Sequence, residues 1–272
     1  TAFRQELRKT KSLTKKPFGV NINLFPSVRP VSNEQYIDIL IEEGVKVVET
    51  SGRSPEPVMK QLKDGGVKVM HKTAGVRFAQ TVERLGVDIV AVVGFECGGH
   101  PPINDVTSLV LIPLTAAAVK IPVVAGGGIA DARGLVAALA LGAEGVLMGT
   151  RFMATTECPM HPKVKEHLVS LGEGDTTIVQ RSIRTNARAW NNEVAQKVLE
   201  MEARGATLEQ LMPLISGLKE KEIFETGNLN AGLLHCGEAV GLVNRVMSVR
   251  EVIQDMVQGA QAIRKRLNAA IG

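Results

Sequence analysis

Residues 121–152 read IPVVAGGGIADARGLVAALALGAEGVLMGTRF and contain two short apolar runs separated by one helical segment. The first run ends in three consecutive glycines, and the second ends in Gly149 and Thr150. The intervening segment closes on Gly142, and glycine is the residue that most often follows the last turn of a helix. A strand, a helix and a second strand in this order predict a βαβ unit with parallel strands.

The same pattern occupies most of the first 152 residues. Six apolar runs are expected to form strands, at 17–22, 45–50, 67–72, 88–94, 121–127 and 144–149. Only 3% of residues are aromatic, so Val, Ile, Leu and Ala must build the core, as in parallel sheets covered by helices. Phosphate sites in (β/α)8 barrels follow strands seven and eight, and the two glycine loops here follow the last two runs. We therefore predict an α/β fold, a TIM (β/α)8 barrel of which strands three to eight are present and the two N-terminal strands are absent from this chain.

The pattern changes after Phe152, and no linker marks an independent domain. Residues 153–186 are expected to be irregular with one strand at 176–182, followed by helices at 190–204, 207–216, 235–246 and 249–270. This organisation predicts a barrel formed by 1–152 and 247–272, and a helical substrate-covering region at 153–246. Such a lid would exclude water from a reacting centre.

Composition argues against several classes of function. The net charge is +4, but the basic residues are scattered and no aromatic residues lie among them to stack on bases, so no nucleic-acid partner is predicted. No apolar run approaches the ~18 residues of a membrane span, and the N-terminus lacks the apolar stretch of a secretory signal. We expect a cytoplasmic protein with no membrane contact. The three cysteines form no CxxC pair, and His161 and His167 are poorly spaced for a shared metal. No metal site is predicted.

The two glycine loops together predict a phosphate site. The residues concerned are Gly126, Gly127, Gly128, Gly149 and Thr150. A glycine has no Cβ to block an approaching phosphate, and the first turn of the following helix offers N–H donors. Asp131 is placed to cap that helix. A tight turn that binds nothing is the alternative for either loop alone, whereas the pair on adjacent strands is more specific.

The segment GFECGGHPP, residues 94–102, follows the fourth apolar run. Gly98 and Gly99 offer a bare backbone that could lie against a flat ring, and His100 is then expected to project into the barrel mouth, where catalytic side chains gather. Histidine can move a proton near neutral pH. The alternative is a hydrogen-bonded loop histidine. Cys97 has no evident paired base, so a structural role is favoured for it.

Two further polar residues end predicted strands. Lys72 is expected to face the barrel mouth and to pair with a cofactor phosphate or ring, or else to reach the rim as a solvated lysine. Asn21 is expected to bond a heterocycle or to cap its loop. His71 should lie on the other side of its strand from Lys72 and is predicted to be structural.

In these motifs the sequence resembles the nitronate monooxygenase (2-nitropropane dioxygenase-like) flavoprotein family. The resemblance rests on KPFGVN at 16–21, VMHKTAGVRFA at 69–79, GFECGGHPP and residues 121–152. It implies a TIM barrel that holds FMN, with the phosphate at Gly126, Gly127, Gly128, Gly149 and Thr150. It also implies that Asn21, Lys72, Gly98 and Gly99 contact the cofactor and that His100 is the catalytic residue. Two departures are visible: the family's first strand with its Gly/Met-rich loop is missing here, and Val93 stands where relatives carry an acid.

The activity that the resemblance implies is oxidation of alkyl nitronates by O2 to a carbonyl compound and nitrite. His100 would remove the α-proton of a neutral nitroalkane. The expected partners are small molecules, and a homodimer is compatible with the sequence. The alternatives are an NAD(P)H:quinone reductase of the same superfamily, an enoyl-acyl carrier protein reductase, and a non-redox barrel isomerase or aldolase that uses Lys72 on a phosphorylated substrate. A cofactor-free binding or scaffold protein is the alternative outside enzymes.

Overall fold

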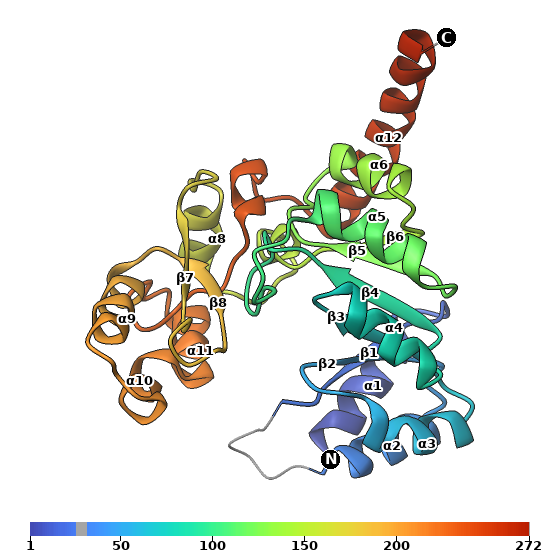
Figure 1. The fold of residues 1–272 in the computed structure, drawn as a ribbon, viewed down its shortest axis with the longest axis horizontal. Coiled ribbons are helices and arrows are strands. Elements are labelled where there is room, and N and C mark those ends of the chain that lie inside the picture. Colours follow the sequence, from blue (N-terminus) through green and yellow to red (C-terminus); the bar gives the residue numbers. More distant parts are fainter. Residues whose placement is uncertain (26–31, 272) are drawn as a thin grey trace. The chain divides into compact units, whose positions relative to one another are not determined.

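The structure, a computed structural model, describes residues 1–25 and 32–271. Six strands form one sheet in which the order along the sheet equals the order along the chain (Figure 1). The strands are β1 (Gly19–Asn23), β2 (Val47–Ser51), β3 (Lys68–Thr73), β4 (Ile89–Val93), β5 (Val123–Gly126) and β6 (Gly145–Leu147). The pairs from β1 to β4 are parallel. Each predicted apolar run overlaps one of these strands, so the prediction of six consecutive strands is confirmed.

Helices follow the strands as the pattern predicts. They are α1 (Ala2–Leu13), α2 (Asn33–Glu42), α3 (Glu56–Asp64), α4 (Val76–Arg84), α5 (Ser108–Ala118) and α6 (Ala132–Ala140). The Asp131 side chain accepts the N–H of Arg133 and caps α6, as expected. Gly44, Gly86 and Gly142 adopt φ of +67°, +87° and +95° just after a helix. Only glycine takes up this left-handed conformation at no steric cost, which explains why the helices end there.

The chain divides into two compact units, Thr1–Val92 with Leu114–Val124, and Val93–Pro113 with Ala125–Gly272. In the first unit, burial alternates along β3. Val69, His71 and Thr73 are buried, whereas Met70 and Lys72 are half-buried. His71 and Lys72 therefore lie on opposite faces of the strand, as predicted. The His71 Nδ1 lies 2.8 Å from the Thr50 hydroxyl on the neighbouring strand β2.

The buried His71 makes stability depend on pH. Burial lowers the pKa of His71 from 6.5 to about 4, with a smaller contribution from Lys72. The unfolded chain takes up this proton below pH 6.5 and the folded chain only near pH 4, so stability falls as the pH drops through that window. We expect a loss of about 3 kcal/mol from this group. Urea unfolding between pH 7 and 4 measures the loss. His71→Gln, which can still bond Thr50 but does not titrate, should flatten this part of the profile, and an unchanged slope would contradict the assignment.

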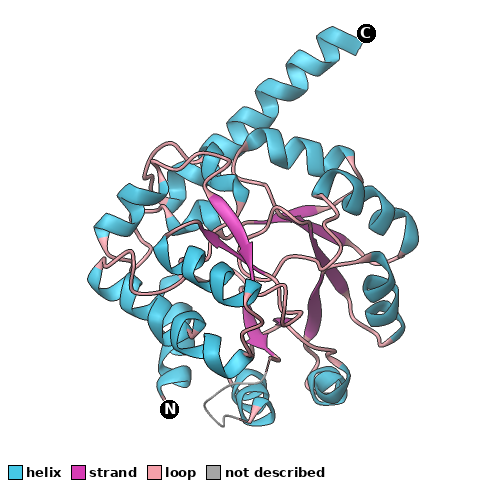
Figure 2. Ribbon diagram, turned by 60° about the vertical axis from the view of Figure 1, so that its left-hand side comes forward, coloured by secondary structure: helices cyan, strands magenta, loops and turns pink. Residues whose placement is uncertain are grey.

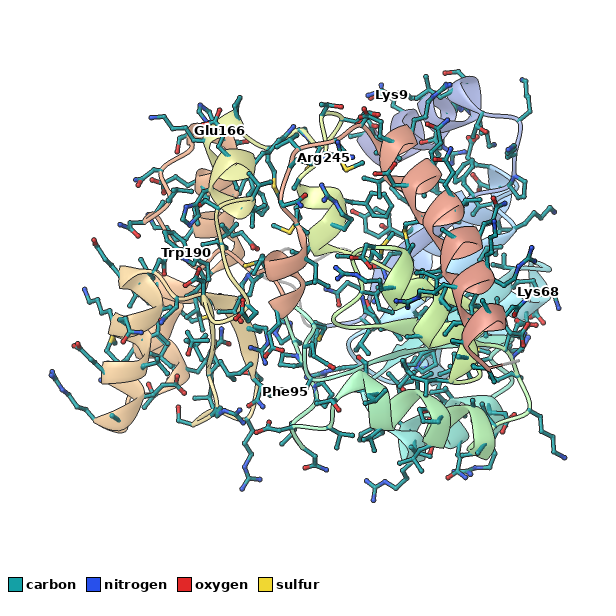
Figure 3. All side chains as sticks on the ribbon, turned by 90° about the horizontal axis from the view of Figure 1, so that it is seen from above. Lys9, Lys68, Phe95, Glu166, Trp190 and Arg245 are labelled. Atoms are coloured by element: carbon teal, nitrogen blue, oxygen red, sulfur yellow. The ribbon has the colours of Figure 1, made fainter. Side chains whose placement is uncertain are left out.

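The second unit contains the segment from Thr150 to Leu242, whose elements surround a two-stranded antiparallel sheet. Its elements are α7 (Thr150–Met153), α8 (Pro162–Leu168), β7 (Thr176–Val179), β8 (Ala187–Trp190), α9 (Glu193–Ala203), α10 (Leu208–Ile215), α11 (Gly217–Thr226) and a 3-10 turn η1 (Glu238–Leu242). One apolar cluster joins the sheet to α9 and α10, and a second joins α8 and α11 to the 234–240 segment. Trp190, labelled in Figure 3, packs against the second cluster, with its ring 3.9 Å from that of His167.

Several sequence predictions for this region were wrong. Residues 153–186 contain α8, and the strand predicted at 176–182 ends at Val179 and pairs with β8, which was not predicted. Because β8 uses Trp190, the helix expected at 190–204 begins at Glu193, and α11 was missed. The helix expected at 235–246 is only the short turn η1. Gly237 directly precedes η1, and a Cβ on it would lie 2.6 Å from the Glu96 carbonyl oxygen and 2.8 Å from the Gly98 nitrogen. This close backbone contact lies where a regular helix was expected.

The last helix, α12 (Val249–Ile271), packs on α6 through Val252, Met256 and Gly259. A Cβ at Gly259 would come within 2.6 Å of the Ala132 side chain, so glycine permits the close crossing. Beyond this contact the helix extends past α6 (Figures 1 and 2). The predicted helix at 249–270 is confirmed. None of the described helices has the length and apolar character needed to cross a membrane.

Candidate active site

The glycine loop after β5 serves two different purposes. A Cβ on Gly126 would lie 2.9 Å from Val93 Cγ1, and one on Gly127 would lie 2.9 Å from the Gly94 nitrogen. These two glycines are therefore needed so that β5 can pack against the end of β4. Gly128 differs, because its Cβ would meet Glu96 only at an ordinary 3.4 Å. Of the three, Gly128 is the position where the missing side chain leaves room for a ligand.

The second glycine loop is open as well. No atom lies within 4 Å of the position that a Gly149 Cβ would occupy. Thr150 begins α7 and is 8% exposed, and its hydroxyl accepts the Gly237 N–H at 2.9 Å. A hydroxyl that accepts one hydrogen bond can still donate another. The loops that follow β5 and β6 thus each contain a glycine at which a Cβ would not clash, and backbone N–H groups at such sites bind phosphate.

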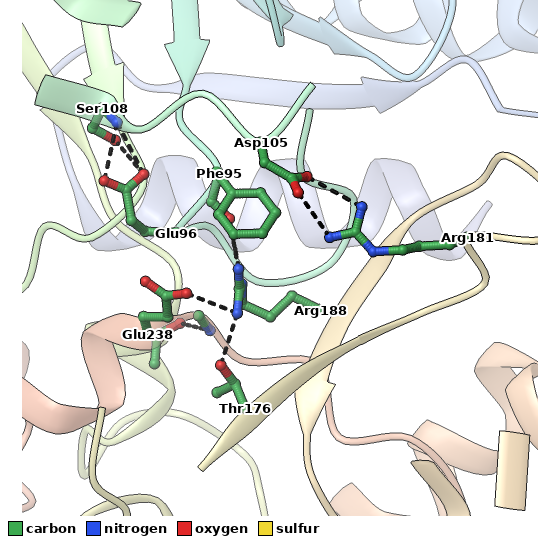
Figure 4. A network of polar contacts seen from close by, with 10 residues as sticks. Phe95, Glu96, Asp105, Ser108, Thr176, Arg181, Arg188 and Glu238 are labelled. Carbon is green, nitrogen blue, oxygen red and sulfur yellow. Dashed lines mark hydrogen bonds and ion pairs between the residues drawn. The ribbon is translucent and has the colours of Figure 1, made fainter. Parts of the chain in front are cut away.

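Glu96 and Ser108 tie the loop after β4 to the loop after β5 (Figure 4). Both carboxylate oxygens of Glu96 accept the Ser108 N–H at 3.0 Å. The Ser108 hydroxyl lies 3.1 Å from Gly126 O, 2.9 Å from Gly127 O and 3.0 Å from the Glu96 carboxylate. Glu96 therefore caps the first turn of α5, and Ser108 holds the glycine loop. Sequence reasoning missed both residues, although a serine at the start of a helix was a visible signal.

We expect Glu96→Ala to destabilise the protein, because it removes the cap of α5. The expected loss is about 1–2 kcal/mol in the free energy of unfolding. Urea denaturation measures it. Glu166→Ala is the matched control, since Glu166 is an exposed glutamate on α8 (Figure 3). Equal stabilities of the two variants would show that the Glu96 cap contributes nothing.

The loop that carries His100 is held by its neighbours. A Cβ on Gly98 would lie 2.6 Å from the Cys236 carbonyl carbon, so the 236–237 backbone occupies the place of a side chain. Gly99 exchanges two backbone hydrogen bonds with Arg188, of 3.1 and 2.6 Å. His100 follows directly and is exposed. Gly98 is thus needed for a contact within the protein, whereas Gly99 is favoured by its φ of +72° and has no atom within 4 Å of its Cβ position. The assignment of both to the cofactor stays a prediction.

Asn21 and Lys72 belong to the first unit. The Asn21 amide donates to Glu49 at 2.7 Å and to the Ser51 hydroxyl at 3.3 Å. Glu49, which sequence reasoning missed, pairs in register with Asn21, and its Oε1 is buried without a partner among the described residues. Lys72 is half-buried and aligned with Ala91. An orphaned acceptor beside an amide fits a ligand that offers an N–H donor, as a flavin ring does.

The described residues contain no group of three or more His, Cys, Asp or Glu that could hold a metal ion. The glycine loops and His100 lie in one compact unit. The model of the nitronate monooxygenase family matches residues 1–259.

The chain belongs to the nitronate monooxygenase family. It is 33% identical to the Rhodococcus jostii (3aS,4S,5R,7aS)-5-hydroxy-7a-methyl-1-oxo-octahydro-1H-indene-4-carboxyl-CoA dehydrogenase, over 99% of this chain and 84% of that protein. It is 32% identical to a probable nitronate monooxygenase of Staphylococcus saprophyticus, over 92% of this chain and 74% of that protein. Among solved structures, FabK from Thermotoga maritima matches with a TM-score of 0.91 and 35% identity, over 98% of this chain and 83% of that one.

Family membership confirms the resemblance, the TIM-barrel fold with its parallel sheet, and the enzyme class. The protein is an oxidoreductase of an FMN-dependent family. The relatives differ in their reactions: one dehydrogenates a CoA derivative and another is described as a nitronate monooxygenase. The comparisons do not test the individual site residues, which stay predictions.

Proposed function

We propose that this protein binds FMN and oxidises alkyl nitronates with O2. The observation that supports a bound cofactor is the pair of glycines Gly128 and Gly149, at which a Cβ would not clash, on the loops after two neighbouring strands. In this proposal Gly126, Gly127 and Thr150 complete the cradle for the phosphate, with Gly126 and Gly127 shaping the loop. Asn21 and Lys72 stay assigned to the cofactor on the family resemblance alone.

The role proposed for His100 is proton transfer. An exposed histidine at the end of a barrel strand can accept the α-proton of a neutral nitroalkane, and in its protonated form it can hold the nitro oxygens of the anion. FMN, when bound, supplies the electron transfer. The chain's own contributions are to bind the phosphate, to place His100 and, through residues 153–246, to exclude water from the substrate.

A second candidate is an FMN-dependent oxidoreductase that acts on an acyl thioester of coenzyme A. The similarity to the Rhodococcus jostii CoA dehydrogenase favours it, because that protein matches 99% of this chain. In that reaction His100 would again exchange a proton beside the carbonyl group of the substrate. Reduction of a quinone by NAD(P)H remains the alternative within the same superfamily.

The visible absorption spectrum of the purified protein tests the cofactor, and anaerobic stopped-flow reduction tests the reaction. The bound flavin should bleach rapidly with ethyl nitronate and slowly with NADH. Rapid bleaching by NADH alone would favour the quinone reductase, and bleaching only by an acyl-CoA would favour the dehydrogenase. A colourless protein that takes up no added FMN would contradict both flavin proposals.

A further inference from the structure

Arg188, on β8, is a buried charge that the proposed function leaves unused. Its side chain is 3% exposed. The guanidinium pairs with Glu238 at 2.9 Å and donates to the Thr176 hydroxyl at 3.0 Å. Its central carbon lies 4.5 Å from the centre of the Phe95 ring. Burial lowers the pKa of Arg188, but a guanidinium stays charged in a protein.

A buried ion pair is poor evidence for stability, because apolar residues of similar volume stabilise such a place as well. The remaining contacts of Arg188 indicate another role. The Nε and Nη2 atoms both donate to the Phe95 carbonyl, at 3.3 and 3.1 Å. The Arg188 backbone exchanges two hydrogen bonds with Gly99. A single residue therefore holds the Phe95–Gly99 segment at both ends, directly before His100. Figure 4 shows the contact with Phe95.

The 236–238 segment contacts the same loop. The Glu238 N–H donates to the Glu96 carbonyl at 3.0 Å, and Gly237 packs flat against Gly98. Glu238 is also the ion-pair partner of Arg188. The loop thus lies between two segments that the Arg188–Glu238 pair joins, and a sideways shift of the loop would break contacts on both.

We propose that Arg188 is a positioning residue that holds the Phe95–Gly99 loop so that His100 lies where it can exchange a proton with the substrate. The proposal rests on the proposed function for the identity of the reaction, but not for the position of the loop. Misplacement of a reacting group by about 1 Å can lower a rate about 10²-fold. Arg188 would act on the rate of proton transfer and not on the binding of the cofactor phosphate.

The test compares Arg188→Met with a matched control, Arg181→Met. Arg181 also lies over the Phe95 ring, at 5.9 Å, and pairs with Asp105, but its side chain is 45% exposed and it donates nothing to the loop backbone. We expect Arg188→Met to lower kcat for neutral nitroethane about 10²-fold, with unchanged FMN content and little change in the KM for the nitronate anion. Arg181→Met should stay within about twofold of the unaltered enzyme, as expected for an exposed ion pair.

A second measurement is independent of turnover. The ring signals of His100, assigned in a histidine-labelled protein by comparison with His100→Gln, should shift or broaden in Arg188→Met and stay unchanged in Arg181→Met. Arg188→Lys keeps the charge but cannot bridge the same set of acceptors, so it should give an intermediate rate, and it replaces the methionine variant if that one does not fold. Unchanged His100 signals and an unchanged rate in both Arg188 variants would overturn the proposal. If the His100 signals shift in Arg188→Met but the unaltered enzyme has no nitroethane activity, the proposed function is overturned and the positioning role stands.

Discussion

Replacing His100 by alanine is expected to lower the turnover of neutral nitroethane by about 10²–10⁴-fold, the usual contribution of a positioned acid or base. The side chain is exposed at the end of a loop whose backbone is held on both sides. Its removal therefore takes away the proposed proton acceptor, while the backbone hydrogen bonds that hold the loop remain. The flavin content should stay the same, because the glycine loops do not depend on the imidazole.

Steady-state kinetics with nitroethane and with its pre-formed anion measure this effect. The anion needs no proton removal, so its turnover should fall far less than that of the neutral compound. His161→Ala serves as the control, since His161 accepts the Lys163 N–H at the start of α8 and belongs to no proposed catalytic group. Equal rates of the His100 variant and the unaltered enzyme on neutral nitroethane would remove His100 from the mechanism.

Filling the glycine loops is expected to abolish FMN binding. Gly128→Leu and Gly149→Leu each place a side chain where the cofactor phosphate is proposed to lie. The Gly149 variant is the cleaner of the two, because its φ of −105° suits any residue and no protein atom lies within 4 Å of the new Cβ. Gly128, at φ +72°, adds backbone strain to the steric effect. We expect at least a 100-fold rise in the Kd for FMN, about 3 kcal/mol.

Flavin fluorescence titration of the apoprotein measures the affinity. Gly205→Leu is the matched control, because Gly205 also has a positive φ, +78°, and open space around its Cβ, but lies between α9 and α10. That variant should have the backbone strain but no side chain at the proposed phosphate site, and it should bind FMN normally. Full flavin retention in both Gly128→Leu and Gly149→Leu would disprove the phosphate cradle. Loss of flavin in Gly205→Leu as well would point to general destabilisation instead.

The elements nearest the candidate site were the most predictable. The strand–helix alternation, the glycines that end the helices and the Asp131 cap are all local signals, because a few neighbouring residues specify each of them. The glycine loops and His100 stand at strand ends for the same reason. The segment between Thr150 and Leu242 was less predictable. Its sheet joins two four-residue strands, which are stabilised by their pairing and by an apolar cluster with α9 and α10, both of them long-range contacts.

Two kinds of site residue could not be predicted from the sequence. Arg188 and Glu238 are far apart in sequence, and no local pattern marks an arginine that will be buried. Nothing in the sequence distinguishes Glu49 from other acids near the end of an apolar run. Its Oε1 is seen to be buried without a partner among the described residues only in the folded structure. Gly98 and Gly237 were visible as glycines, but not as the two sides of one close backbone contact.

Six consecutive strands, the glycine loops after the last two and the histidine after the fourth could all be predicted from the amino-acid sequence, because period, capping and turn chemistry act over a few residues. The folded structure was needed to tell which glycines leave room for a ligand and which let two strands approach, and this separates Gly128 and Gly149 from Gly126 and Gly127. The same holds for the loop before His100. Its position depends on hydrogen bonds from Arg188 and Glu238, and such long-range contacts exist only once the chain has folded.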